Sequence, residues 1–364
     1  MTAGLRIACV SGHSRWWRKQ RLVAKYVKMR LEGVIYPDVH CLALMLSDRF
    51  DFLVEGERVA PGQYDLILSE LQASDSQLRY IESLVDAGPA PVAIIPGPPA
   101  ILSRELTDAK LHRVLHILNA APHVWAYSPE IKTFCDGLAG RERASLIPWP
   151  YDLAATQKLG HSAQRDDGQL RILVQAPMSF HDIVQNHPFV LKAVLLDLWR
   201  DLPDELRRRL SFHTFIYNDE DRARYHASGF AEGLPFTLAR KLGYRAFVRF
   251  VAGCDGIINL TAGSILGRIT FLAAALGRPG IFSDNSRFNT ALYPGSCVAM
   301  FDTVRLRDLV RAMLLGLSTG SQPGSAAPAA TDPRLLPDAA VAAAMGDFAA
   351  NQARLRHILD HPLG

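Results

Sequence analysis

The chain has 364 residues, of which 49% are hydrophobic and 21% are charged, and its formal net charge is +4 at pH 7. This length exceeds the size at which one hydrophobic core keeps growing, so the sequence predicts two domains. The composition is that of an ordinary globular protein, and the charge is too small to indicate nucleic-acid binding by itself.

The cysteines and the apolar runs narrow the class of protein further. The five cysteines are odd in number, scattered and never arranged as C-x-x-C, so the sequence suggests neither a disulfide framework nor a zinc cage. No apolar run approaches the ~20 residues that span a bilayer, and the N-terminus lacks an apolar core followed by a cleavage site. We therefore expect a cytoplasmic protein, for which any contact with a membrane would be peripheral and at the inner face.

Strand and helix signals alternate in the first half. Strand signals lie at 5–10, 64–69, 91–95, 123–127 and 144–147, and helical patterns lie at 14–31, 76–86, 107–119 and 129–138. Strands separated by helices of this length predict a parallel, doubly wound sheet. Residues 1–150 are therefore expected to form an N-terminal Rossmann-like domain.

The pattern breaks at Pro148 and in the polar stretch 160–168, which we interpret as a linker. Alternation then restarts, with strands at 170–175, 211–217, 256–260 and 279–283 and helices at 188–200, 238–252 and 306–315. We expect a second Rossmann-like domain over 165–335, which includes a Ser/Gly/Pro/Ala-rich surface connection at 318–332. A helical pattern over 337–359 predicts that 337–364 returns to the first domain as a C-terminal helix.

The segment from Cys254 to Asn285 is the most informative one. A buried strand leads through a turn with Gly263 and Ser264 into a helix entered beside Arg268. A helix N-terminus collects unpaired N–H groups and the positive end of the helix dipole, which favours phosphate. Arg268 can bind phosphate bidentately, while Gly263 lets the backbone come close. The alternative is a capped helix with a solvent-exposed Arg268.

Three segments, together with the two-domain pattern and the terminal helix, resemble the GT-B glycosyltransferases. They are the linker 146–152, the strand 250–260 and the small-residue helix with Gly-x-Pro at 272–280. The closest resemblance is to the retaining clan that includes glycogen synthases and many bacterial polysaccharide enzymes. It implies two Rossmann-like domains facing across a cleft, with the acceptor in the first domain and the nucleotide sugar in the second.

The sequence departs from this family at the donor site. The family places two glutamates eight positions apart, and here Ser264 and Leu272 stand at those positions. The Arg and Lys that usually hold the diphosphate have no clear match in 175–181. Two interpretations remain open: a divergent enzyme that uses other hydrogen-bond donors, or a copy that has lost catalysis.

The resemblance places the donor site at the strand ends of the second domain. The candidate donor- and phosphate-binding residues are Asn259, Thr261, Gly263, Ser264, Arg268, Thr270, His181, Ser283, Asp284 and Asn285. We expect a UDP- or GDP-linked sugar as co-substrate, with no further cofactor and no metal. A surface histidine is the alternative interpretation of His181.

The first domain offers candidate bases for the acceptor hydroxyl. His13 follows the first strand, and an imidazole can accept a proton near neutral pH. Glu70 and Asp75, after the strand at 64–69, are rival bases, and a retaining mechanism can proceed without one.

A basic, aromatic segment opens the helical pattern that follows His13. It begins with Arg15, Trp16, Trp17, Arg18 and Lys19. Cations and interfacial aromatics favour an anionic membrane or a lipid-diphosphate acceptor. A solvated basic helix face is the alternative, and no motif that reads nucleic acid accompanies the charge.

These features together predict a glycosyltransferase of hexosyltransferase type. It would move a sugar from a nucleotide-diphosphate donor to a glycan, a lipid-linked or a small-molecule acceptor. The alternatives are a sugar-nucleotide epimerase of the same fold and a catalytically inactive binding or scaffold subunit.

Overall fold

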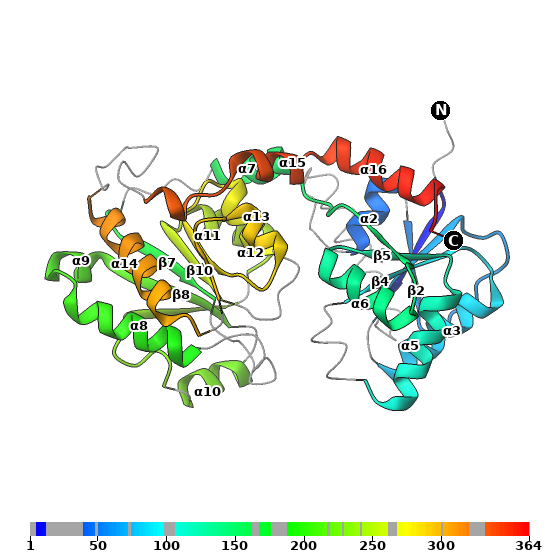
Figure 1. The fold of residues 1–364 in the computed structure, drawn as a ribbon, viewed down its shortest axis with the longest axis horizontal. Helices are drawn as coiled ribbons and strands as arrows, with labels where there is room; N and C mark the ends of the chain where they lie inside the picture. Colours follow the sequence, from blue (N-terminus) through cyan, green and yellow to red (C-terminus); the bar gives the residue numbers. More distant parts are fainter. Residues whose placement is uncertain are drawn as a thin grey trace. The chain divides into compact units, whose positions relative to one another are not determined.

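The chain forms two units, each with its own sheet, in a computed structural model (Figure 1). The first unit is Met1–Asp152 with Met345–Gly364, and the second is Leu153–Ala344. The structure describes residues 5–11, 39–47, 50–71, 74–97, 106–161, 167–175, 188–216, 219–227, 229–240, 242–260, 268–299, 301–319 and 332–363.

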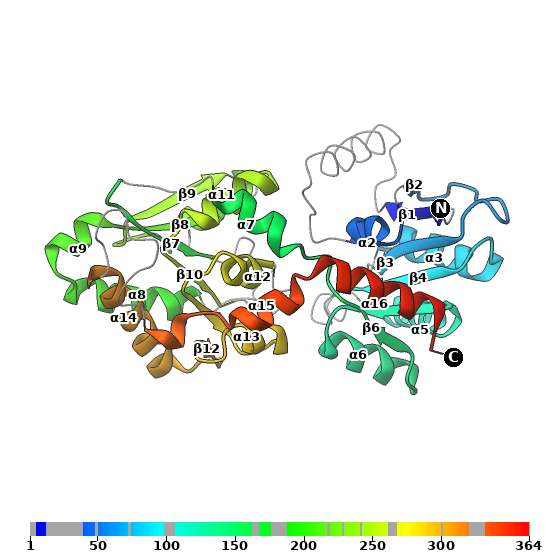
Figure 2. The ribbon, with the colours of Figure 1, turned by 90° about the horizontal axis from the view of Figure 1, so that it is seen from above.

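The first unit has a six-stranded parallel sheet between two helical layers. The strands in spatial order are β2 (Phe50–Val54), β1 (Ile7–Ser11), β3 (Leu66–Leu71), β4 (Val92–Pro96), β5 (His123–Ala126) and β6 (Ala144–Leu146). One face carries α3 (Asp75–Ala87), α5 (Asp108–Ala120) and α6 (Pro129–Ala139). The other carries α2 (Val39–Leu46) and α16 (Phe348–Asp360) (Figure 2).

Local signals explain these elements. All the residues of β4 and β5 are buried, as expected for strands covered on both faces. Ser74, Thr107 and Ser128 cap the N-termini of α3, α5 and α6 by accepting a backbone N–H three residues on.

The second unit repeats this architecture with another strand order. The strands in spatial order are β12 (Cys297–Val298), β11 (Gly280–Ser283), β10 (Gly256–Asn259), β7 (Leu170–Val174), β8 (Leu210–Ile216) and β9 (Phe236–Arg240), all parallel. One face carries α8 (Pro188–Asp201) and α14 (Thr303–Thr319). The other carries α7 (Leu153–His161), α11 (Tyr244–Ala252) and α12 (Arg268–Ala275).

Shorter helices complete the second unit. They are α9 (Asp204–Arg209), α10 (Asp219–Ala227), α13 (Arg287–Leu292), a 3-10 turn at Pro333–Leu335 and α15 (Ala339–Met345), whose last residue already belongs to the first unit. The core under α8 and α14 is aliphatic and aromatic, and it includes Ile172, Phe212, Ile258 and Val310. Among the residues described, no helix is long and apolar enough to cross a membrane.

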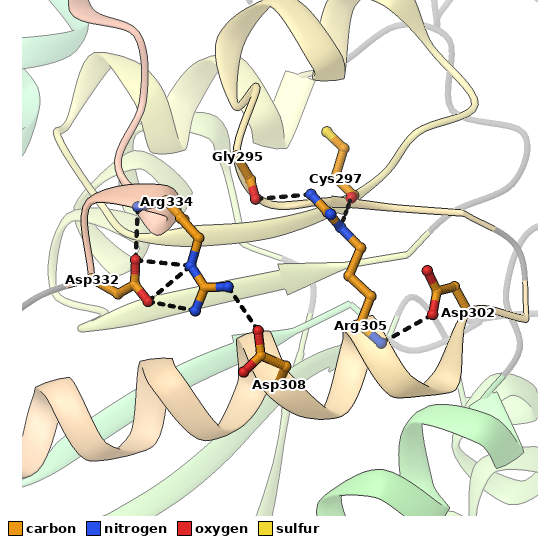
Figure 3. A network of polar contacts seen from close by, with 7 residues as sticks. All are labelled: Gly295, Cys297, Asp302, Arg305, Asp308, Asp332 and Arg334. Carbon is orange, nitrogen blue, oxygen red and sulfur yellow. Dashed lines mark hydrogen bonds and ion pairs between the residues drawn. The ribbon is translucent and has the colours of Figure 1, made fainter.

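Residues 332–338, here called the strap, fasten the chain to the second unit before it returns to the first (Figure 3). Arg334 pairs with Asp332 beside it and with Asp308 on α14, each at 2.7 Å. Leu335 is fully buried in the core of the unit. Gly295 permits the close passage, because a Cβ there would lie 2.7 Å from the carbonyl oxygen of Arg334. The strap is therefore an integral part of the second unit.

Arg305 lies on α14 and binds the backbone at the start of β12 and just before it. Its Nε donates to the carbonyl oxygen of Cys297 at 2.9 Å, and its Nη2 donates to that of Gly295 at 3.1 Å (Figure 3). The helix that carries the strap's partner Asp308 thus also fixes the segment over which the strap passes.

The predicted class, two Rossmann-like domains, is confirmed, and three local expectations change. Residues 238–240 belong to edge strand β9, and the helix begins only at Tyr244. The predicted linker contains α7. The pattern at 337–359 forms two helices, because Asp347 caps a new one by accepting the N–H of Ala350.

The C-terminal helix packs on the first unit, as expected. Gln352 on α16 donates from Nε2 to the carbonyl oxygen of Met45 at 2.6 Å. Asn351 donates to that of Trp149 at 3.4 Å, and the Trp149 ring stacks on those of Tyr127 and Tyr151. Along the chain, the units divide after residues 152 and 344. From the sequence, we expected the first domain to end at 150, the second to span 165–335 and the C-terminal helix to begin at 337.

Candidate functional site

The candidate site of the second unit is the carboxyl edge of its sheet. Strand order reverses between β7 and β10, and open parallel sheets bind ligands outside such a switch point. β10 ends at Asn259, and Gln175 follows β7, donating its backbone N–H to the carbonyl oxygen of Ile258 at 2.9 Å. β11, paired with β10, ends at Ser283. Three polar residues thus meet at this edge.

Asn259 lies at the switch point with a buried amide. The residue is 4% exposed, and its Oδ1 has no hydrogen-bond partner among the residues that the structure describes. A buried acceptor without a partner costs about 1–3 kcal/mol, so such a group is uncommon in a folded core. The position therefore offers a ready acceptor for a hydroxyl or N–H group.

A chain of hydrogen bonds connects the end of β11 to two helices. The Thr270 hydroxyl on α12 donates to Oδ1 of Asn289 on α13 at 2.7 Å. Asn289 in turn donates from Nδ2 to the carbonyl oxygen of Ser283 at 3.0 Å. The Ser283 hydroxyl donates to Oδ1 of Asn285 at 2.7 Å. The sequence-predicted residues Thr270, Ser283 and Asn285 are thus brought together.

Arg268 is a cationic residue of this edge. It is the first residue of α12, it is half-buried, and its Nε is enclosed by the protein. The guanidinium charge and the positive end of the helix dipole therefore fall at the same end of one helix, an arrangement that suits an anion.

Asp284 is exposed beside this network, next to β12. Its backbone N–H donates to the carbonyl oxygen of Val298. Burial, together with the Asp284 carboxylate, raises the pKa of the nearby Cys297 thiol to about 12. That thiol is therefore protonated at neutral pH and is a poor nucleophile.

The corresponding edge of the first unit carries Glu70. Strand order reverses between β1 and β3, and Glu70 is the penultimate residue of β3. The buried side chain of Gln77 donates from Nε2 to the Glu70 carbonyl oxygen at 3.0 Å, which fixes the strand end. Asp75 is exposed as the first residue of α3, where a carboxylate complements the helix dipole. Glu70 thus lies at the strand end itself, whereas Asp75 lies on the helix that follows.

Several sequence-predicted residues lie outside the described part of the chain. On the donor side they are His181, Thr261, Gly263 and Ser264, and on the acceptor side they are His13, Arg15, Trp16, Trp17, Arg18 and Lys19. Their roles stay predictions.

Two positions add to the sequence interpretation. Leu272, where the family resemblance places a carboxylate, is 2% exposed and packs inside the unit. Asn289 was not singled out from the sequence, although an amide between Phe288 and Leu292, both buried in the structure, could have indicated it.

Comparison with known proteins places the fold. No family model and no curated protein sequence matches the chain. Among solved structures, the HepE protein of Anabaena in complex with UDP-glucose matches with a TM-score of 0.65 at 12% identity, over 98% of this chain and 99% of that one.

Two sugar-phosphate synthases have the same architecture. A UDP-forming α,α-trehalose-phosphate synthase from Burkholderia vietnamiensis matches with a TM-score of 0.61 at 12% identity, over 98% of this chain and 99% of that one. Sucrose-phosphate synthase from Thermosynechococcus elongatus matches with a TM-score of 0.58 at 13% identity, over 97% and 94%. The chain has the GT-B fold, and the resemblance seen in the sequence is confirmed at that level.

Proposed function

We propose that the chain is a glycosyltransferase that moves a sugar from a nucleotide-diphosphate donor to an acceptor hydroxyl. The observation that carries the proposal is a fold match over nearly the whole chain to HepE in complex with UDP-glucose. The polar switch point of the second unit supports it independently, because Asn259 offers a buried acceptor beside the end of β7.

The donor would bind at the carboxyl edge of the second unit. Arg268 and the N-terminus of α12 supply positive charge for the diphosphate, and Asn259 supplies a hydrogen-bond acceptor for a donor hydroxyl or base N–H. Catalysis would be electrostatic, since charge grows on the leaving diphosphate in the transition state. The nucleotide sugar is the co-substrate, and the proposal invokes no further cofactor or metal.

The acceptor would face the first unit. Glu70 would take the proton from the acceptor hydroxyl, with His13 and Asp75 as rivals, if the mechanism uses a base. The acceptor is a glycan, a lipid-linked saccharide or a small molecule. The segment Arg15–Lys19 favours an acceptor that carries phosphate or lies at the inner face of an anionic membrane.

A second candidate function rests on Leu272. This buried, apolar residue stands where the family resemblance places a glutamate, which favours a subunit that keeps the fold and has lost transfer. Such a subunit would serve as a binding or scaffold partner.

A nucleotide panel tests the proposal. Thermal unfolding of the full chain should be measured with UDP, GDP, ADP and their glucose or mannose conjugates, and we expect stabilisation by a UDP or GDP species. Release of the nucleoside diphosphate is then followed with and without acceptor sugars. Indifference to every nucleotide would contradict a donor site, binding without turnover would favour the scaffold, and donor conversion without any acceptor would indicate an epimerase.

A further inference from the structure

Asn289 connects three elements around the candidate donor site. It lies on α13, accepts a hydrogen bond from Thr270 on α12 and donates one to the carbonyl oxygen of Ser283 at the end of β11. Thr270 is 0% exposed and Asn289 is 2% exposed. Water therefore offers neither group an alternative partner, and both hydrogen bonds are held in the interior.

The chemistry of this bridge requires an amide. Asn289 uses its oxygen as an acceptor and its nitrogen as a donor at the same time, which a carboxylate, a hydroxyl or an apolar side chain of this size cannot do in the same geometry. Its backbone is also fixed, because its carbonyl oxygen accepts the N–H of Tyr293 and Ser286 caps α13.

The Thr270 hydroxyl is committed to the bridge. Threonine within a helix commonly bonds a carbonyl of its own preceding turn, whereas here the hydroxyl reaches α13. Thr270 is two residues from Arg268, in the same first turn of α12. The bridge therefore sets the height and rotation of the turn that carries the guanidinium, relative to the end of β11.

We propose that Asn289, through Thr270, is the positioning residue of the donor site: it holds the first turn of α12 so that Arg268 meets the diphosphate. This inference rests on the proposed function. Its physical basis is the steep dependence of recognition on placement, because groups that bind a charged ligand must be held by a supporting layer to within about 0.5 Å.

The test uses variants that differ by one group. Thr270→Val removes the hydroxyl at nearly constant shape, Thr270→Ser keeps it, and Asn289→Leu removes both amide contacts. Thr156→Val is the matched control, since Thr156 is a buried threonine on α7 in the same helical layer. UDP affinity by calorimetry and the melting temperature are measured for each full-length variant.

The expected result separates positioning from stability. Thr270→Val and Asn289→Leu should each weaken UDP binding about tenfold, the effect of leaving a buried partner unsatisfied. Thr270→Ser should retain near wild-type affinity, and Thr156→Val should retain it even where the melting temperature falls. Equal UDP affinity of Thr270→Val and wild type would overturn the inference, as would a loss that Thr270→Ser fails to rescue.

A second measurement distinguishes failure of this inference from failure of the proposed function. If the wild-type chain bound no nucleotide, the donor site itself would be wrong. Amide hydrogen exchange over Arg268–Ala275 would still test the bridge, because Asn289→Leu should speed exchange there and Thr156→Val should not. Unchanged exchange in Asn289→Leu would overturn the positioning role.

Discussion

The two units contain the same kind of sheet, but different kinds of residue lie at its carboxyl edge. In the second unit, amides and hydroxyls from strand β11, the turn after it and two helices form a connected hydrogen-bonded network around the edge. In the first unit, the edge carries the carboxylate of Glu70 on β3 and the stacked rings of Tyr127 and Trp149. The strand order also differs, so the switch point lies between β7 and β10 in one unit and between β1 and β3 in the other.

This difference suggests that the two units have different functional roles. A rigid, uncharged hydrogen-bonded network beside the Arg268 guanidinium suits recognition of a fixed, highly charged group such as a diphosphate. A single carboxylate at a strand end suits proton transfer or binding of sugar hydroxyls. Substitutions in the second unit should therefore act on nucleotide affinity, and substitutions in the first should act on turnover.

The largest expected effect concerns the independence of the units. Leu335 in the strap is fully buried in the second unit, and Leu355 on α16 is fully buried in the first unit. Replacing either with alanine should cost about 2–5 kcal/mol of unfolding free energy. Hydrogen exchange resolved along the sequence should show that Leu335→Ala speeds exchange mainly in the second unit. Leu355→Ala should speed exchange mainly in the first unit. The reverse pattern would contradict the assignment of the strap.

Glu70→Gln should lower turnover about 100-fold while leaving UDP affinity unchanged, because general base catalysis contributes about that much. Steady-state kinetics and calorimetry on the same preparation measure the two quantities. Asp75→Asn tests the rival carboxylate, and we expect it to change turnover little because Asp75 is an exposed residue of the first turn of α3. Normal turnover of Glu70→Gln would remove Glu70 as the base and leave His13, Asp75 or a base-free retaining mechanism.

Arg268→Ala should weaken UDP binding about 30-fold, as expected from loss of a charge-assisted contact to phosphate. Titration calorimetry measures the affinity, and raised salt should reduce the difference between variant and wild type. Arg311→Ala, an exposed residue of α14, is the matched control and should bind normally. An unchanged affinity of Arg268→Ala would exclude it from the site.

Asn259→Leu should lower UDP affinity about fivefold without lowering the melting temperature, because the amide oxygen it removes has no partner in the described structure. The thermal scan and the binding titration together provide the measurement. A large fall in melting temperature with unchanged affinity would show instead that Asn259 serves folding.

The smallest effect is a pH dependence of the first unit. Burial, together with the nearby Arg143 guanidinium, lowers the pKa of His123 below its ordinary value of 6.5. The unfolded chain then takes up this proton at a higher pH than the folded one, so stability is full above 6.5 and is lost as the pH falls below it.

Urea unfolding at pH 7.5 and 5.5 measures this loss. His123→Gln should show a smaller difference between the two pH values than wild type. His226→Gln, an exposed residue in the second unit, is the control and should behave like wild type. An equal difference in wild type and His123→Gln would contradict the assignment.

The sequence revealed the elements whose signals are local. The apolar runs that became β10 and β11 are bounded by Gly, Asp and Pro, so their ends could be placed closely. β12 has only two residues, too few for any periodicity. β9 lies at the sheet edge with its residues only partly buried, which removes the contrast that separates a strand from a helix.

The site divides in the same way. The positions of Arg268 and Asn259 could be predicted because they stand where a strand ends and a helix begins. The contacts of Asn289 could not, because its partners are set by the packing of α13 on α12 and β11. The commitment of the Thr270 hydroxyl to Asn289 is likewise a tertiary property.

The last twenty residues, Met345–Gly364, belong to the unit that begins the chain. During synthesis every residue of the second unit is added before the segment that covers α2. The first unit therefore stays without one of its helices until the second has been translated, although translation starts with the first. A nascent chain stalled shortly after Ala344 should then expose the α2 surface to chaperones and proteases.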